Sequence, residues 1–211
     1  MHQMCRPSSV VLKMFDTFQS LSEMELQSLS EFSKFVDAKP GQVIVAQGCQ
    51  SDFVFFILTG VAKLTRNVNS AAVDDSSLTE VVVQLFVPGD AIGDAGVFQN
   101  VIFKATVRAV TPCQLLAVEK SKIQALAKSN MAVLASLYNR ASKKFFKSVE
   151  CADYAYGRVI KRIEKLAFEF KKIGLDLYKH LSKAEIARML GASRVAVSNC
   201  LSLHNRSDNK H

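Results

Sequence analysis

The segment "GASRVAVSN", residues 191–199, carries the side chains with the clearest chemistry. If a helix begins after its small-residue turn, one face of that helix presents a set of polar and small side chains: Ser193, Arg194, Val195, Ser198, Asn199 and Ser202. An arginine can bond the O6 and N7 atoms of guanine, and an asparagine can bond the N6 and N7 atoms of adenine. Side chains of these types could therefore recognise base edges in DNA.

A helix-turn-helix must position these side chains. Ser182 and Glu185, three residues apart, form a capping box that begins a short helix ending near Leu190. Gly191 then permits a tight turn, Ser193 caps a second helix that continues to about Asn205, and the inward positions are apolar: Ile186, Leu190, Val197 and Leu201. Because such corners also occur in proteins that never bind DNA, the motif needs support from elsewhere in the chain.

The distribution of charge supplies some of that support. The net charge is +8, but residues 1–118 hold 8 Lys and Arg against 11 Asp and Glu, whereas residues 119–211 hold 19 against 8. A basic half can be a solvated helical surface, or it can bind nucleic acid or an anionic membrane. Lys179 and Lys183 flank the helical corner and are candidate phosphate contacts.

The secondary-structure pattern changes where the charge changes. A helical stretch at 21–35 precedes a series of short β-type runs separated by Gly and Pro turns, which predicts an antiparallel β-roll or sandwich of about eight strands. The runs are "QVIVAQ", "FVFFIL", "VAKLTR", "EVVVQLFV", "AIG", "KATVRAV" and "QLLAVE". From Ser121 the pattern is helical for about thirty residues. The fold class is therefore α+β, with an acidic β half and a basic α half.

The helix that joins the two halves has two apolar faces. One follows a heptad seam, and we assign a dimer interface to four of its positions: Leu134, Tyr138, Ala141 and Phe145. The second face, with Leu137, Phe146 and Val149, is expected to pack on the β domain. The alternative is a helix buried on both faces inside a monomer.

Composition excludes several classes of protein. The most apolar run covers about ten residues, whereas a membrane span needs about 20, and the N-terminus lacks the pattern of a secretory signal. The five cysteines lie far apart and include no C-x-x-C pair, which favours reduced thiols over a disulfide or zinc framework. We expect a soluble cytoplasmic protein that does not bind membranes.

The ordered series "FFILTGVAKL", "PGDAIGDAGVF", "KATVRAV", "GRVIKRIEKLA" and "LSKAEIARMLGASRVAVSN" resembles the Crp/Fnr family of bacterial transcription regulators over nearly the whole chain. The resemblance implies a homodimer that binds palindromic double-stranded DNA and contacts RNA polymerase, with a sensor β-roll at 1–128, a dimerisation helix at 129–155 and a DNA-binding domain at 156–211. Arg194 matches the arginine that begins the recognition helix of the family.

The chain departs from that family at the effector site. Members that bind cyclic AMP have a Gly-Glu pair and then an Arg followed by Ser or Thr, where this chain has Gly93-Asp94 and Phe103-Lys104. Because a phosphate facing Phe103 would lack a partner, we do not expect cyclic-nucleotide binding. A single N-terminal cysteine, Cys5, does not favour an iron–sulfur cluster. The effector remains unknown.

Haem is an alternative cofactor, with His2, Met4 or Cys5 as conceivable ligands. About ten polar residues follow Leu201, so the β-hairpin wing of the family is expected to be absent. An enzyme of the cupin type is not expected, because all four histidines lie outside the β region. The remaining alternative is a regulatory module that acts on a protein partner without DNA.

Overall fold

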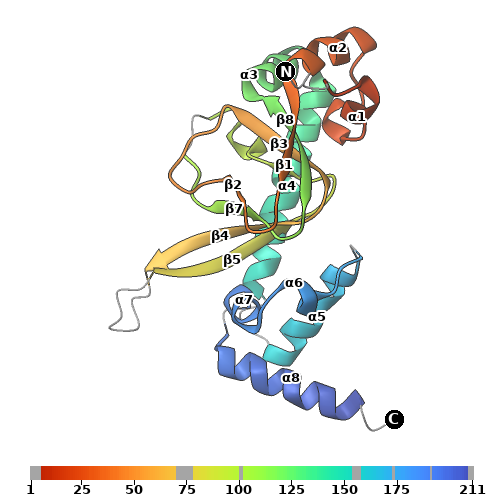
Figure 1. Ribbon diagram of the computed structural model, residues 1–211. Helices are drawn as coiled ribbons and strands as arrows, with labels where there is room; N and C mark the ends of the chain where they lie inside the picture. The colour runs from red at the N-terminus through yellow and green to blue at the C-terminus, as the bar shows by residue number, and fades with distance from the viewer. Residues whose placement is uncertain are drawn as a thin grey trace. The chain divides into compact units, whose positions relative to one another are not determined.

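The computed structural model describes residues 6–69, 78–99, 102–153, 158–172, 174–190 and 192–208. The chain divides into two compact units: residues 1–64 with 84–145, and residues 65–83 with 146–211. Figure 1 shows the elements of both units, which are described separately below.

Two antiparallel sheets form the β-roll, and short helices precede it. The helices are α1 (Ser9–Lys13), η1 (Asp16–Phe18) and α2 (Glu23–Glu31). Among the described residues the sheets have the orders β1-β8-β3-β6 and β2-β7-β4-β5. The strands are β1 (Ser33–Ala38), β2 (Val43–Val45), β3 (Phe53–Thr59), β4 (Ala62–Asn69), β5 (Leu78–Phe86), β6 (Ala91–Ile92), β7 (Thr106–Ala109) and β8 (Cys113–Glu119). The predicted α+β class is confirmed.

Strand β3 connects two hydrophobic clusters because its successive side chains point to opposite faces. Phe56 is fully buried and packs on the N-terminal helices, with ring centroids 4.9 Å from Phe15 and 5.0 Å from Phe18. Ile57, on the other face, lies in a second cluster with Val107 and other residues between the two sheets. The core therefore fixes the register in which β3 pairs with β8.

The expected helix at 21–35 is wrong over its last residues, which form β1. Helix α2 ends at Glu31, and Ser33–Ala38 then pairs along its whole length with β8. The pairing buries Ser33 and Ala38 and supplies partners for the strand's backbone groups. Tertiary pairing overrides a helical pattern that was weak after Glu31.

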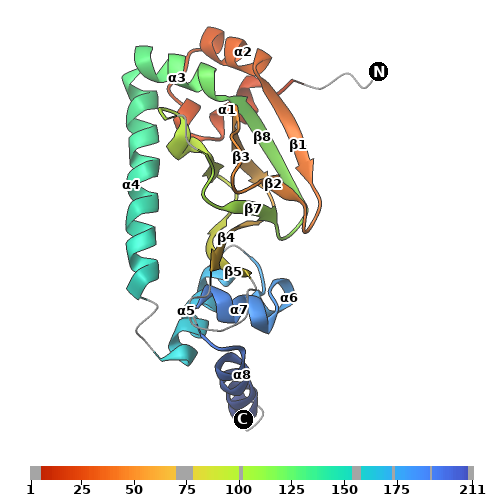
Figure 2. The ribbon, with the colours of Figure 1, turned by 90° about the vertical axis from the view of Figure 1, so that its left-hand side faces the viewer.

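The long helical stretch after β8 is broken once. Helix α3 (Lys120–Ser129) ends at Asn130, and α4 (Met131–Asp153) begins there. The Asn130 side-chain oxygen accepts hydrogen bonds from the backbone nitrogens of Ala132, at 3.0 Å, and Val133, at 3.3 Å. An asparagine cap thus replaces the Gly or Pro signal that would mark a turn in the sequence. Figure 2 shows the first-unit part of α4 alongside the strands.

The helices of the second unit after α4 are α5 (Val159–Lys172), α6 (Leu177–His180), α7 (Lys183–Met189) and α8 (Arg194–Asp208). Gly174 ends α5 in the left-handed region, with φ 73°, and its nitrogen donates to the Lys171 carbonyl at 3.0 Å. Ile163 and Phe170 of α5 are buried, and α5 and α7 both contact α8. No helix in the described part of the chain is long and apolar enough to cross a bilayer.

Candidate nucleic-acid interface and effector position

The start of α7 has the predicted capping box. The Ser182 hydroxyl accepts from the Glu185 backbone nitrogen at 3.2 Å, and the Glu185 carboxylate accepts from the Ser182 nitrogen at 2.9 Å. These two bonds satisfy backbone donors that the first turn of a helix leaves unpaired. They fix the position at which α7 begins, and thereby the corner that follows it.

Helix α8 begins where the sequence predicts. The Ser193 hydroxyl accepts from the Ala196 nitrogen at 3.1 Å, and the predicted inward side chains are buried: Ile186, Leu190, Val197 and Leu201. Gly191 lies outside the described residues. The buried face sets the rotation of α8 about its axis, so the opposite face is open to solvent.

The open face carries the side chains that the sequence singled out. Arg194 and Asn199 are exposed, and Val195 is 68% exposed. Ser198 is half-buried and accepts a 3.4 Å bond from Lys183, while the Ser202 hydroxyl donates to the Ser198 carbonyl at 2.8 Å. Arg194 and Asn199 thus combine exposure with side chains that can bond a base edge through two atoms. Lys179, in α6, is also exposed.

One basic side chain of this unit is structural. Arg162 is 9% exposed, and its guanidinium donates to the Leu190 carbonyl at the end of α7. It stabilises the orphan carbonyl at that helix terminus. The sequence contains no signal for this role, because Arg162 is one of many cations in the basic half of the chain.

Helix α4 presents an exposed apolar stripe. Leu134, Tyr138 and Phe145 are 37%, 72% and 63% exposed, and Ala141 is exposed with them. Leu137 is buried in the β-roll as expected, together with Val133. The expectation that Phe146 packs on the β domain is wrong, because its side chain is 63% exposed. The side chain of Val149 lies outside the described residues.

Two cations take the place of Phe146 on the β-facing side of α4. Arg140 and Lys144 continue the spacing of Val133 and Leu137, and both reach Asp94. The Lys144 ammonium contacts the Asp94 Oδ1 atom and donates to the Ala91 carbonyl at 2.7 Å. The place of these two cations on the helical face of Val133 and Leu137 was the signal available in the sequence.

The Asp94 carboxylate is therefore engaged inside the protein. Its side chain is 4% exposed, and Oδ2 lies 3.5 Å from the Arg140 Nε atom. Arg140 also donates from Nη2 to the Gly89 carbonyl at 2.8 Å, and the Ala95 nitrogen donates to Oδ1 at 3.0 Å. The two cations supply the opposite charge that a buried carboxylate requires. We call Asp94, Arg140 and Lys144 the ionic cluster.

Phe103 fills the neighbouring space. A Cβ atom built on Gly93 would lie 3.2 Å from the Phe103 ring, so the ring packs against the Gly93 backbone. The Phe103 backbone is held by bonds to the Cys49 carbonyl, at 2.9 Å, and from the Gly48 nitrogen, at 2.8 Å. Lys104 is exposed. The structure thus brings Gly93, Asp94 and Phe103 together and leaves Lys104 in solvent.

The described residues hold no group of three or more His, Cys, Asp or Glu side chains that could bind a metal ion. The haem alternative depends on His2, Met4 and Cys5, which lie outside the described residues.

A β-roll, a long helix and a helix-turn-helix follow one another along the chain, and comparisons with known proteins agree with this arrangement. Residues 35–130 match the family model of the cyclic nucleotide-binding domain. The CRP-like cAMP-activated global transcriptional regulator of Mycobacterium tuberculosis is 22% identical over 198 residues, covering 87% of this chain and 83% of the relative.

Solved structures show the same fold. A regulator of the Crp/Fnr family from Eubacterium rectale has a TM-score of 0.75 at 13% identity, covering 92% of this chain and 88% of that one. The c-di-GMP responsive regulator CLP of Xanthomonas campestris has a TM-score of 0.68 at 16% identity, and the match covers 89% of this chain and 93% of CLP. FixK2 of Bradyrhizobium japonicum has a TM-score of 0.68 at 15% identity, and the match covers 83% of this chain and 86% of FixK2. The chain is a Crp/Fnr-like protein, and the resemblance seen in the sequence is confirmed.

Proposed function

We propose that this chain is a transcription regulator that reads DNA with the first turns of α8. The observation that carries the proposal is the Ser193-capped helix, whose buried face turns Arg194, Val195 and Asn199 toward solvent. A helix of this kind fits the major groove, where its N-terminal residues meet base edges. The net charge of residues 119–211, with 19 Lys and Arg against 8 Asp and Glu, favours an anionic partner. The relative from M. tuberculosis is itself named a transcriptional regulator.

The functional form in this proposal is a homodimer joined through α4. Leu134, Tyr138, Ala141 and Phe145 form an apolar stripe on the side of α4 away from the buried Val133 and Leu137. Such a stripe favours association with a second copy, because a two-fold axis along α4 would bring two identical stripes together. Because a two-fold symmetric dimer has two α8 helices, the DNA site that it binds should be palindromic. We place this regulator in the cytoplasm, acting with RNA polymerase on DNA.

The effector of the proposed regulator is not a cyclic nucleotide. Asp94 is already paired with Arg140 and Lys144, and the Phe103 ring packs on the Gly93 backbone. A phosphate anion there would meet an aromatic ring where related sites provide an arginine, and an unpaired buried charge costs several kcal/mol. The cAMP activation in the relative's name is therefore not carried over to this chain.

Selection from random-sequence DNA at a fixed salt concentration tests the proposed function. The full chain is expected to enrich a palindrome whose half-sites lie about 34–36 Å apart, one turn of B-DNA. Equal binding to all sequences would contradict specific recognition. That result would instead favour the regulatory module that acts on a protein partner.

A further inference from the structure

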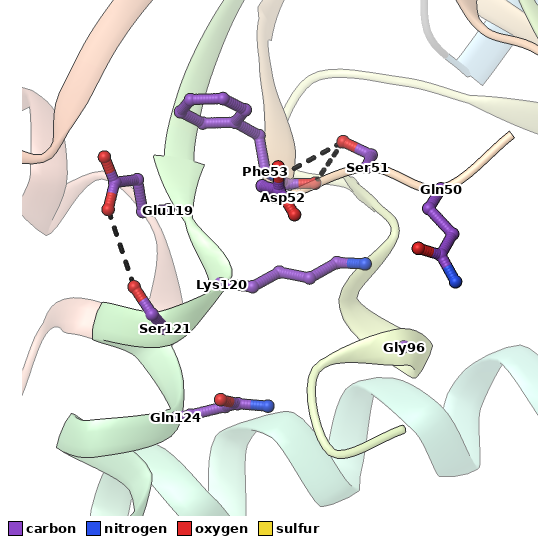
Figure 3. A pocket seen from close by; sticks show the side chains of 9 residues that line it. All are labelled: Gln50, Ser51, Asp52, Phe53, Gly96, Glu119, Lys120, Ser121 and Gln124. Carbon is purple, nitrogen blue, oxygen red and sulfur yellow. Dashed lines mark hydrogen bonds between the residues drawn. The ribbon is translucent and has the colours of Figure 1, made fainter. Parts of the chain in front are cut away.

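A cavity of about 480 Å³ lies in the first unit, and none of the three residues of the ionic cluster lines it. Three segments form its wall: the loop that enters β3, the 3-10 turn η2 (Asp94–Gly96), and the junction of β8 with α3. The lining residues are Gln50, Ser51, Asp52, Phe53, Gly96, Glu119, Lys120, Ser121 and Gln124. Figure 3 shows the Lys120 side chain extending toward Gln50, with the Gln124 side chain of the same helix running beside it.

Lys120 is held in place while its ammonium is left without an anion. Its backbone nitrogen donates to the Asp52 carbonyl at 2.8 Å, which fixes the start of the side chain. The ammonium lies 5.6 Å from the centre of the Phe103 ring, and it makes no ion pair within the described part of the chain. Burial lowers the pKa of Lys120, and the charge of Asp52 opposes that shift only in part. An anion in the cavity would supply the missing counter-charge.

The other polar groups restrict what such an anion can be. The Ser51 hydroxyl donates its only hydrogen to the Phe53 carbonyl, and the Gln124 amide nitrogen uses one of its two N–H donors on the Val97 carbonyl. The Gln50 amide makes no hydrogen bond to any described residue and remains available as a donor. The Asp52 carboxylate, whose charge acts on Lys120, disfavours a second negative charge and can accept from hydroxyl groups. Figure 3 shows the Glu119 carboxylate turned toward Ser121, whose hydroxyl donates to it at 3.5 Å.

We propose that the cavity binds a small hydroxylated monocarboxylic acid, with its carboxylate between Lys120 and Gln50 and its hydroxyl groups toward the acceptors on the wall. A single negative charge balances one ammonium, whereas a phosphate dianion would add a second charge near Asp52. A volume of about 480 Å³ accommodates an acid of about six carbons, which lies within the usual range of small-molecule sites. The cavity adjoins the family's effector position through η2, but neither Gly93 nor Asp94 lines it.

Calorimetric titration of the full chain with gluconate, with lactate and with inorganic phosphate tests this site without DNA. Wild type is expected to bind gluconate more tightly than phosphate. Lys120→Met should weaken gluconate binding at least about tenfold, because a charge-assisted bond is lost. Lys128→Met is the matched control, since Lys128 is an exposed residue of the same helix.

The Gln50→Ala variant covers the case in which Lys120→Met fails to fold. Gln50 is exposed and lies in a loop, so its replacement should leave the fold intact and weaken gluconate binding. No binding of either acid to wild type, tighter binding of phosphate, or equal affinities of wild type and both cavity variants would overturn the proposal. Because the titration contains no DNA, its failure is separate from a failure of DNA recognition.

Discussion

The ionic cluster makes a quantitative prediction for Asp94→Asn. The amide keeps the shape of the side chain and removes the negative charge that Arg140 and Lys144 share. The two cations remain with side chains that are 14% and 24% exposed. Each cation also retains one backbone carbonyl, Gly89 for Arg140 and Ala91 for Lys144.

The cost follows from these contacts. Breaking a fully buried pair by removing one partner costs about 3–5 kcal/mol, and a hydrogen bond to a charged group is worth about 1.5–3 kcal/mol. Both cations keep some solvent and one carbonyl, which reduces the loss. We therefore expect Asp94→Asn to lower the free energy of unfolding of the first unit by about 2 kcal/mol. Lys144→Met should cost less, because Arg140 still pairs with the carboxylate.

Urea unfolding followed by hydrogen exchange measures the loss in the free energy of unfolding of the first unit. Amides of α4 between Val133 and Phe145 report on the first unit, which need not unfold together with the second. Lys143→Met is the control, since Lys143 is an exposed neighbour on the same helix. If Asp94→Asn and Lys143→Met had the same stability, the cluster would not stabilise α4 on the β-roll.

Three further predictions concern the interface, the effector and a turn. Phe145→Asp places a charge on the exposed apolar stripe and should yield monomers in light scattering, whereas a persistent dimer would contradict the interface. Calorimetry with cyclic AMP or cyclic GMP should show binding no tighter than about 1 mM, because Phe103 packs on Gly93; micromolar affinity would refute this. Gly60→Ala should lower stability by more than about 3 kcal/mol in thermal unfolding. Its Cβ would lie 2.2 Å from the Pro112 carbonyl at φ 87°, and a near-native melting temperature would contradict that clash.

Local signals predicted the helix-turn-helix well. The capping box at Ser182 and the cap at Ser193 use side chains that bond within a few residues, so spacing alone identifies them. The apolar positions of the corner, such as Ile186 and Val197, follow helical periodicity and are buried. The β-type runs likewise coincide with strands β2 to β8.

Long-range contacts could not be predicted in the same way. Strand β1 depends on pairing with β8, about eighty residues away in the chain. The partners of Asp94 come from α4, about fifty residues away, and only the fold brings them together. Phe146 was expected to be buried from its apolar character, whereas Arg140 and Lys144 face the roll because Asp94 requires opposite charge.

The measurement that tests the proposed DNA reading most directly is the affinity of Arg194→Ala for the selected site and for a scrambled sequence across a salt series. We predict a loss of about 1–3 kcal/mol at the selected site, relaxed preference at one base pair of each half-site, and little change on scrambled DNA. The control Lys179→Ala should weaken binding to both sequences alike and flatten the salt dependence. An equal loss on both sequences for Arg194→Ala would make Arg194 a phosphate contact, and no loss on either would contradict the proposed reading of DNA by α8.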